Sequence, residues 1–145
     1  MFAAGVGLWS AQRARVAEAF AISGAPYADA SFRVVDERLA ALEDAWRAAA
    51  VTACRDTRVA RVQPEGVFAQ RAACLAVRRQ RAAAIIDDLA AVDRDRIADV
   101  PRLVAALPRL EECADPQVLA GLTPRPTAPA QVAALVELEA TLATL

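Results

Sequence analysis

The chain has 145 residues, enough for one domain that buries roughly two-thirds of the surface exposed by its unfolded form. Hydrophobic residues make up 57% of it but aromatic residues only 5%, and 17 basic against 18 acidic side chains leave a net charge of −1, too balanced for the basic footprint of a nucleic-acid-binding protein. The sequence contains no Lys and no His, which excludes Ser-His and Cys-His pairs, His-ligated metals, Walker loops and Schiff-base lysines, so we expect no enzyme.

Residues 1–9 are apolar but too few to span a bilayer, which needs about 20 residues. They lack the basic start of a signal peptide, so a secretory leader is not expected. Two interpretations remain for them, the remnant of a membrane span or an ordinary N-terminal helical turn. Ser10 then predicts the N-cap of a first helix that reaches about Ile22, and Gly24-Ala25-Pro26 predicts its end.

The strongest pattern is an apolar stripe with unbroken three- and four-residue spacing, which predicts one helix from about Asp29 to Arg58. Pro64 is best tolerated in a first helical turn, so residues 61–66 predict a reversal of the chain. A second stripe predicts another long helix to about Ala91, and two long helices joined by a short turn pack antiparallel. The stripes are Phe32, Val35, Leu39, Leu42, Trp46, Ala49 and Ala53, and Phe68, Ala72, Leu75, Ala82, Ile86 and Leu89.

Shorter helices are predicted beyond this hairpin. Asp93 can cap a further segment, which Pro101 kinks or splits in two. Asp115-Pro116 opens a short helix that Gly121 closes, and residues 121–129 are too rich in Pro for a helix and predict an extended connector. We therefore expect an all-α fold, an antiparallel helical bundle over residues 10–120 built on one long helix hairpin with shorter flanking helices.

Residues 130–145 predict a last helix that lacks its partner. Its apolar side chains form one stripe, which we expect to bind a protein partner or adjoining helical repeats. The residues of this expected partner-binding stripe are Leu135, Leu138, Leu142 and Leu145.

Charged clusters and thiols in the chain do not predict a reactive site. Asp87-Asp88 with Asp93 and Asp95 favours a solvated helix end over a cation site, because Arg residues interleave with the carboxylates. The Arg residues of positions 71–81 ring their helix and form no stripe for phosphates. Cys54 lies near a helix C-terminus, which disfavours a thiolate. We expect no catalytic, cofactor-binding or metal-binding residue, and no cofactor.

The chain resembles the region that follows the membrane span in a group of bacterial receptor-type serine/threonine protein kinases. The resemblance covers almost the whole chain without gaps through the two central Cys segments, and departs from the family at residues 60–64, where the family has Arg-Gly-Glu-Gln-Ser. It rests on Trp9, Arg13, Val16, Ala19-Phe20, Gly24, Pro26-Tyr27, Trp46, Ala53-Cys54, Thr57-Arg58-Val59, Gln63, Arg71, Ala73-Cys74-Leu75, Leu107-Pro108 and Cys113-Ala114-Asp115.

In that family a cytoplasmic kinase domain leads to one membrane span, then to this helical region and then to a tetratricopeptide array. The resemblance implies a non-catalytic sensor or linker module, outside the cytoplasmic membrane, that acts through protein–protein or ligand interaction. It implies membrane contact only through a missing upstream span, and the balanced charge predicts no nucleic acid partner. The alternative is a free-standing cytoplasmic helical adapter or scaffold that binds a partner helix.

An extracytoplasmic location, as the resemblance implies, would allow a disulfide. Cys54 with Cys74 is the expected pair, because both flank the same hairpin turn, provided that the two helices are offset enough to bring them together. Cys113 is then the odd thiol, or replaces Cys54 if the segment after Pro108 folds back across the third helix. Three small, buried, unpaired Cys residues are the remaining alternative.

Overall fold

The structure is a computed structural model that describes residues 7–121 and 129–142. These residues are mostly helical and contain no strand, which confirms the predicted all-α class. The helices are α1 (Arg13–Ser23), α2 (Ala28–Arg58), α3 (Glu65–Ala90), α4 (Val100–Ala105), α5 (Pro116–Gly121) and α6 (Pro129–Leu142), with two short 3₁₀ helices, η1 (Ile97–Asp99) and η2 (Glu111–Ala114).

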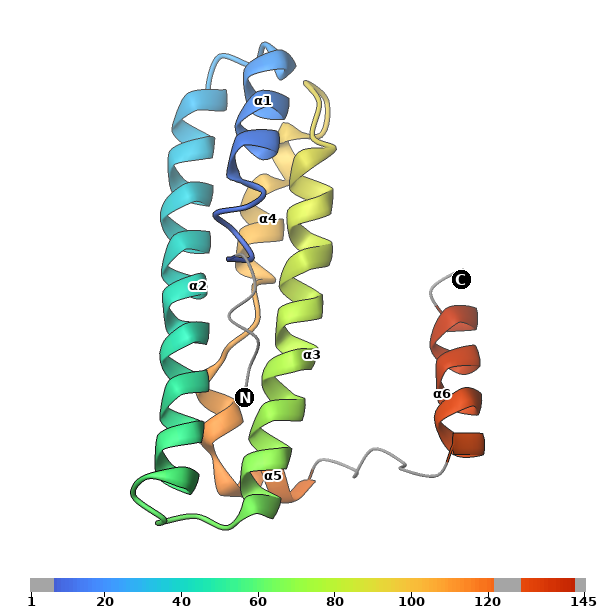
Figure 1. The fold of residues 1–145 in the computed structure, drawn as a ribbon. Coiled ribbons are helices and arrows are strands. Elements are labelled where there is room, and N and C mark those ends of the chain that lie inside the picture. Colours follow the sequence, from blue (N-terminus) through green and yellow to red (C-terminus); the bar gives the residue numbers. More distant parts are fainter. Residues whose placement is uncertain (1–6, 122–128, 143–145) are drawn as a thin grey trace.

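The long antiparallel hairpin of α2 and α3 is the frame of the bundle (Figure 1). Helix α1 packs against both long helices in the half of the bundle away from the hairpin turn, and α4 packs there too. In the half near the turn, η2 and α5 lie on α3. The chain thus covers the hairpin with two separate groups of short elements. The segment between α4 and η2 joins these groups near mid-height of the bundle (Figure 1).

Two apolar clusters fill the two halves. The cluster around α1 contains Phe20 and Leu39, each 1% exposed, and the cluster near the turn is built on Leu75, also 1% exposed. Along the predicted stripe of α2, Val35, Leu39 and Ala53 are buried, whereas Phe32, Leu42, Trp46 and Ala49 are half-buried.

The predicted limits of the two long helices agree with the structure to within one or two residues, but the predicted cap of the first helix is wrong. Helix α1 begins at Arg13, and Ser10 lies in the preceding turn. The N–H groups of this turn bond to a carboxylate of α2, so tertiary contacts replace the local cap. Gly24 ends α1 with a φ of 64°, the left-handed conformation that favours Gly at this position.

A polar network closes the hairpin turn. The guanidinium of Arg71, 8% exposed, donates to Asp56 Oδ2 at 3.0 Å and to Gln63 Oε1 at 2.9 Å. The Gln63 amide then donates to Thr57 Oγ1 at 2.7 Å and to the Ala53 carbonyl at 3.0 Å. These bonds join both helices to the turn and satisfy the buried side chains that they link.

Capping carboxylates organise the later short helices. Asp93 Oδ1 accepts bonds from the N–H groups of Asp95 and Arg96, and Asp115 Oδ1 accepts one from Gln117, as expected of Asx caps. Pro101 lies in the first turn of α4, directly after η1. The predicted segment is therefore split in two at this proline, because Pro is tolerated only at a helix start.

Helix α6 stands clear of the bundle in Figure 1. Leu135 is half-buried and Leu138 is 57% exposed, so this part of the predicted stripe is present on the helix. Leu142 is the last residue of α6. Leu145 and residues 122–128, most of the predicted connector, lie outside the described residues.

Candidate functional site

Residues 7–13 dock on α2 through a carboxylate, and we call this segment the latch. Glu43 Oε2 accepts hydrogen bonds from the backbone N–H groups of Trp9, at 2.7 Å, and Ser10, at 2.8 Å. Glu43 Oε1 accepts a third from the Ser10 hydroxyl at 3.1 Å. The Glu43 carboxylate of α2 therefore binds the N–H groups of the turn that precedes α1.

A second carboxylate of α2 holds the side chains of the latch. Asp36 accepts from the Trp9 indole N–H at 2.9 Å and from two nitrogens of Arg13 at 2.6 and 2.8 Å. Trp9 is 3% exposed and belongs to the apolar cluster around α1. The bundle therefore includes Leu8 and Trp9, which corrects the predicted start at residue 10; residues 1–6 lie outside the described part.

The contacts of the latch lower the pKa of both carboxyl groups. For Asp36 the hydrogen bond from Arg13 is the main cause, and it outweighs the opposing effect of burial. For Glu43 burial is the largest single effect and raises the pKa, but the hydrogen bonds from Ser10 and Trp9, with the charge of Arg47, together lower it further. Both groups are thus held as carboxylates.

Acid is expected to release the latch. Because the pKa values of Asp36 and Glu43 are lowered in the folded chain, their stabilisation is complete above the ordinary values of 3.8 and 4.5 and is lost as pH falls through the lower folded values. Unfolding by urea between pH 7 and pH 2 should show this loss, and Asp36→Asn with Glu43→Gln should flatten it. The exposed control Asp44→Asn should leave the profile unchanged.

Gly7 leaves room for the Glu43 carboxylate at the start of the latch. A Cβ at this position would overlap the Glu43 carboxylate and the Ser10 hydroxyl. Gly7→Ala should therefore displace Glu43 and cost about 1 to 2 kcal/mol, the loss of one or two charge-assisted hydrogen bonds. Gly66→Ala is the matched control in chemical denaturation, because nothing lies within 4 Å of its Cβ. Equal stability of the two variants would contradict this role of Gly7.

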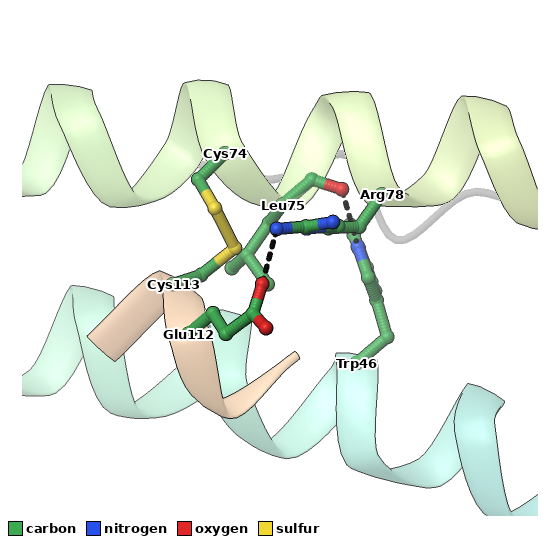
Figure 2. The surroundings of a disulfide bond; sticks show 6 residues. All are labelled: Trp46, Cys74, Leu75, Arg78, Glu112 and Cys113. Atoms are coloured by element: carbon green, nitrogen blue, oxygen red, sulfur yellow. Dashed lines mark hydrogen bonds and ion pairs between the residues drawn. A yellow bond between two sulfur atoms is a disulfide. The ribbon is translucent and has the colours of Figure 1, made fainter. Parts of the chain in front are cut away.

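A second segment, residues 107–115, follows α4 and packs on α3 through η2. We call this segment the strap. A disulfide between Cys74 of α3 and Cys113 of η2 fastens it, with a Cα–Cα distance of 5.6 Å (Figure 2). The bond is buried, since Cys74 is 6% and Cys113 2% exposed. Arg78 of α3 also pairs with Glu112 of the strap.

The expected pair of Cys54 and Cys74 is wrong, and Cys54 carries a free, half-buried thiol. The register of the hairpin explains this result. The Trp46 indole N–H bonds to the Leu75 carbonyl, and Cys74 packs in one cluster with Ala50, so the part of α2 beside Cys74 lies about one helical turn before Cys54. Cys113 takes the place of Cys54 in the disulfide, which was the predicted alternative. The chain after Pro108 folds back over α3 and brings Cys113 next to Cys74.

Latch and strap meet at a cleft between α2 and α3, close to mid-height of the bundle. The cleft is small, with a cavity volume of about 40 Å³, and it is partly open to solvent. The latch contributes Gly7 and Leu8, and the strap contributes Pro108 and Leu110. The two long helices supply the remaining lining residues, which are Leu42, Glu43, Trp46, Arg47, Arg78, Arg79 and Ala82.

The lining of this cleft combines an aromatic ring with guanidinium groups. The Trp46 indole N–H donates to the Leu75 carbonyl at 3.1 Å, which fixes the ring against α3 (Figure 2). Arg79 lies over that ring, 5.1 Å from its centroid. Arg47 stands at the rim and pairs with Glu43 and Asp44. Among the described residues that line the cleft, no nucleophile is paired with a base.

The other candidates from the sequence do not gather into a site. Asp87 and Asp88 are exposed, and Asp87 pairs with Arg15. Among the described residues, no group of three or more acidic, Cys or His side chains could hold a metal ion. The sequence analysis did not single out Asp36 and Glu43 as site residues. Their spacing of seven residues, which places them on one helix face, is the signal that could have paired them.

No family model, characterised protein or solved structure matches this chain. Within residues 7–121 and 129–142, no helix is long and apolar enough to cross a membrane.

Proposed function

We propose that this chain is a non-catalytic sensor or linker module of a membrane serine/threonine kinase signalling protein, which acts through ligand or protein interaction. One observation supports the sensor role above all. The cleft is lined by the latch, where the chain enters the bundle, and by the strap, where it leaves toward α5 and α6. A ligand in the cleft would contact both segments at once.

This arrangement would couple occupancy of the cleft to the two segments that carry the chain onward. A ligand that binds only when both segments are docked stabilises the docked state, and the stabilisation grows with the logarithm of the ligand concentration once that exceeds the dissociation constant. Leu8 of the latch and Leu110 of the strap would supply the contacts that distinguish the docked from the released state. The effect would pass upstream through the latch and downstream through the strap.

The kinase attachment rests on the resemblance in sequence, and the disulfide is consistent with it. Buried disulfides form and persist in oxidising compartments, as expected for the outer side of a cytoplasmic membrane. Peptide mapping without reduction should recover a fragment that joins Cys74 to Cys113. Three free thiols after air oxidation would remove the physical argument for this location.

The DNA that encodes the chain and its two flanks tests the kinase proposal directly. An in-frame kinase domain followed by an apolar span upstream, or tetratricopeptide repeats downstream, would support it. An in-frame stop codon directly upstream would contradict it and favour the free-standing adapter.

The adapter alternative is favoured by one observation, the exposure of Leu138 on α6. If α6 lacks a partner, its amides should exchange hydrogen far faster than those of α2 and α3, and the chain should self-associate. Leu138→Asp should reduce this association in analytical ultracentrifugation, while Val34→Asp, an equally exposed change on α2, should not. Slow exchange of α6 in a strict monomer would contradict the missing partner.

A further inference from the structure

We propose that α6 of one copy of the chain docks on the outer face of α2 in a second copy, close to the hairpin turn, and that two copies exchange their α6 helices in this way. The exchange would supply the partner that the adapter alternative requires, and it rests on the missing partner of α6 proposed above. Three observations carry it: an exposed apolar stripe on α2, two cations beside it that lack an ion pair, and the acidic, apolar composition of α6.

The last turns of α2 present an exposed stripe to solvent. Val51 is 61% and Val59 74% exposed, and Arg55 between them is exposed too. Val59 directly follows α2 with helical backbone angles, so the spacing of four residues places the three side chains on one helix face. Ala50 and Ala53, which are buried, lie on the opposite face by the same periodicity. We call Val51, Arg55 and Val59 the outer stripe.

Two guanidinium groups at this end of α2 have no carboxylate partner within residues 7–121 and 129–142. Arg55 lies inside the outer stripe, and Arg61 lies in the turn that follows it, whereas Arg58 pairs with Glu65. Arg61 has a φ of 54°, a left-handed conformation that costs a residue with a Cβ more than it costs Gly. An exposed cation at a position that favours Gly points to a role of its side chain outside the fold.

Helix α6 matches this surface in length, polarity and charge. Its 14 residues span about 21 Å, and the outer stripe spans about 12 Å from Val51 to Val59, so one helix can cover the stripe and reach the turn. It contains two Glu and no basic residue. Val132 is 42% and Leu138 57% exposed, so α6 has apolar side chains available for contact. A helix that carries both kinds of group can bury the two valines and neutralise Arg55.

The arrangement of the helices favours α6 of a second copy over α6 of the same chain. In Figure 1, α3 stands between α2 and α6, and the chain leaves the bundle from α5, which packs on α3. The outer stripe faces away from α3, because Ala50 on the opposite face of α2 packs in one cluster with Cys74 and Leu75 of α3. The same chain would have to pass around the bundle to reach the stripe, whereas a second copy approaches it directly from solvent.

Two copies that exchange α6 make the same contact twice. Such an arrangement closes with twofold symmetry and leaves neither outer stripe open. Once the first α6 has docked, the second contact forms within the complex, at an effective concentration in the millimolar range. Each contact can therefore be small, as a stripe of three side chains implies, while the two together hold the dimer.

Charge reversal tests this pairing in the full chain. Arg55→Glu should repel the two Glu of an incoming α6 and raise the dissociation constant of the dimer at least about tenfold in sedimentation velocity. Glu137→Arg combined with Glu139→Arg should weaken the dimer from the other side. When these two variants are mixed in equal amounts they should associate again, because each outer stripe then meets an α6 of opposite charge.

Further variants separate docking from folding. Val51→Glu, at an exposed position of the stripe, should keep the fold and weaken the dimer. Arg38→Glu, an exposed change on α2 outside the stripe, is the matched control and should dimerise as the parent chain does. Arg61→Gly suits the left-handed backbone, so it should keep or raise the stability in urea while it weakens the dimer. A purely structural role of Arg61 would not separate these two readouts.

A chain that stays monomeric at the highest concentration reached would overturn the exchange, and so would a dimer that survives both Arg55→Glu and Val51→Glu. If that dimer is still lost in Leu138→Asp, then α6 binds another surface, and the adapter alternative stands without the outer stripe. Charge-reversed variants that stay apart when mixed would overturn the charge pairing. None of these results bears on the kinase attachment, which the flanking coding sequence tests independently.

Discussion

Replacing Cys74 and Cys113 together by Ala is expected to lower the free energy of unfolding by about 4 kcal/mol. The bond joins residues 39 positions apart, and closure of a loop of this size removes entropy from the unfolded chain that lies between the values of roughly 3 and 4.7 kcal/mol for shorter and longer loops. The same loss should appear when the parent chain is unfolded in a strong reductant, as measured by urea titration.

Cys54→Ala provides the matched control for this prediction. Its thiol is free and half-buried on α2, so the loss should stay below about 1 kcal/mol, in both oxidised and reduced protein. A parent chain whose stability does not depend on reductant would contradict a bond between Cys74 and Cys113. A large effect of Cys54→Ala in oxidised protein would instead restore the pair of Cys54 and Cys74.

Phe20→Ala should destabilise the chain by about 3 to 5 kcal/mol, as the loss of a fully buried aromatic side chain usually does. Phe20 is 1% exposed, belongs to the apolar cluster around α1, and makes an edge contact with Phe32 at a centroid distance of 5.8 Å. The surrounding helices can close such a void only in part. Chemical denaturation followed by far-UV circular dichroism measures the loss.

Ile22→Ala tests the same helix without the core. Ile22 is 76% exposed and lies two residues from Phe20, so its truncation should change stability by less than about 0.5 kcal/mol. Similar losses for the two variants would mean that α1 does not pack on the hairpin as described. A small loss of stability for Phe20→Ala would mean that α1 does not unfold cooperatively with the hairpin.

The disulfide prediction bears on the proposed sensor because it concerns the strap, and the Phe20 prediction bears on it because Phe20 lies in α1, the helix into which the latch leads. The strap is fastened by a covalent bond, whereas the latch is held by hydrogen bonds and by Trp9. We therefore expect the latch to open at lower cost than the strap, and amide exchange should show less protection at Ser10 than at Cys113. A ligand that bridges both would act mainly on the latch.

The sequence alone was sufficient to predict the two long helices and the hairpin that they form. The stripe from Phe32 to Ala53 has the period of an α-helix, and Pro64 ends the reversal, so local rules alone placed α2 and α3 to within one or two residues. Local signals also marked the end of α1 at Gly24 and the turns at Asp93 and Asp115, whose carboxylates accept bonds from nearby N–H groups. Each of these features depends on residues within a few positions of one another.

The candidate site was not predictable by the same means. Glu43 caps residues 34 and 33 positions earlier in the chain, and Asp36 binds Trp9 across 27 positions. The periodicity of α2 shows that both carboxylates lie outside its apolar stripe, but it does not show which segment of the chain covers them. The latch, and with it the cleft, follow from the way α1 packs on the hairpin.

The cysteines show the same division between sequence and structure. The positions of the cysteines, with the location that the family resemblance implies, suggested a disulfide near the hairpin turn, but the choice between Cys54 and Cys113 depended on helix register. A single turn of offset, about 5.4 Å, moves a Cα out of bonding range. The sequence by itself determined which residues form helices, because that depends on local spacing; only the tertiary structure decided which distant side chains meet, because a chain reversal of unknown register lies between them.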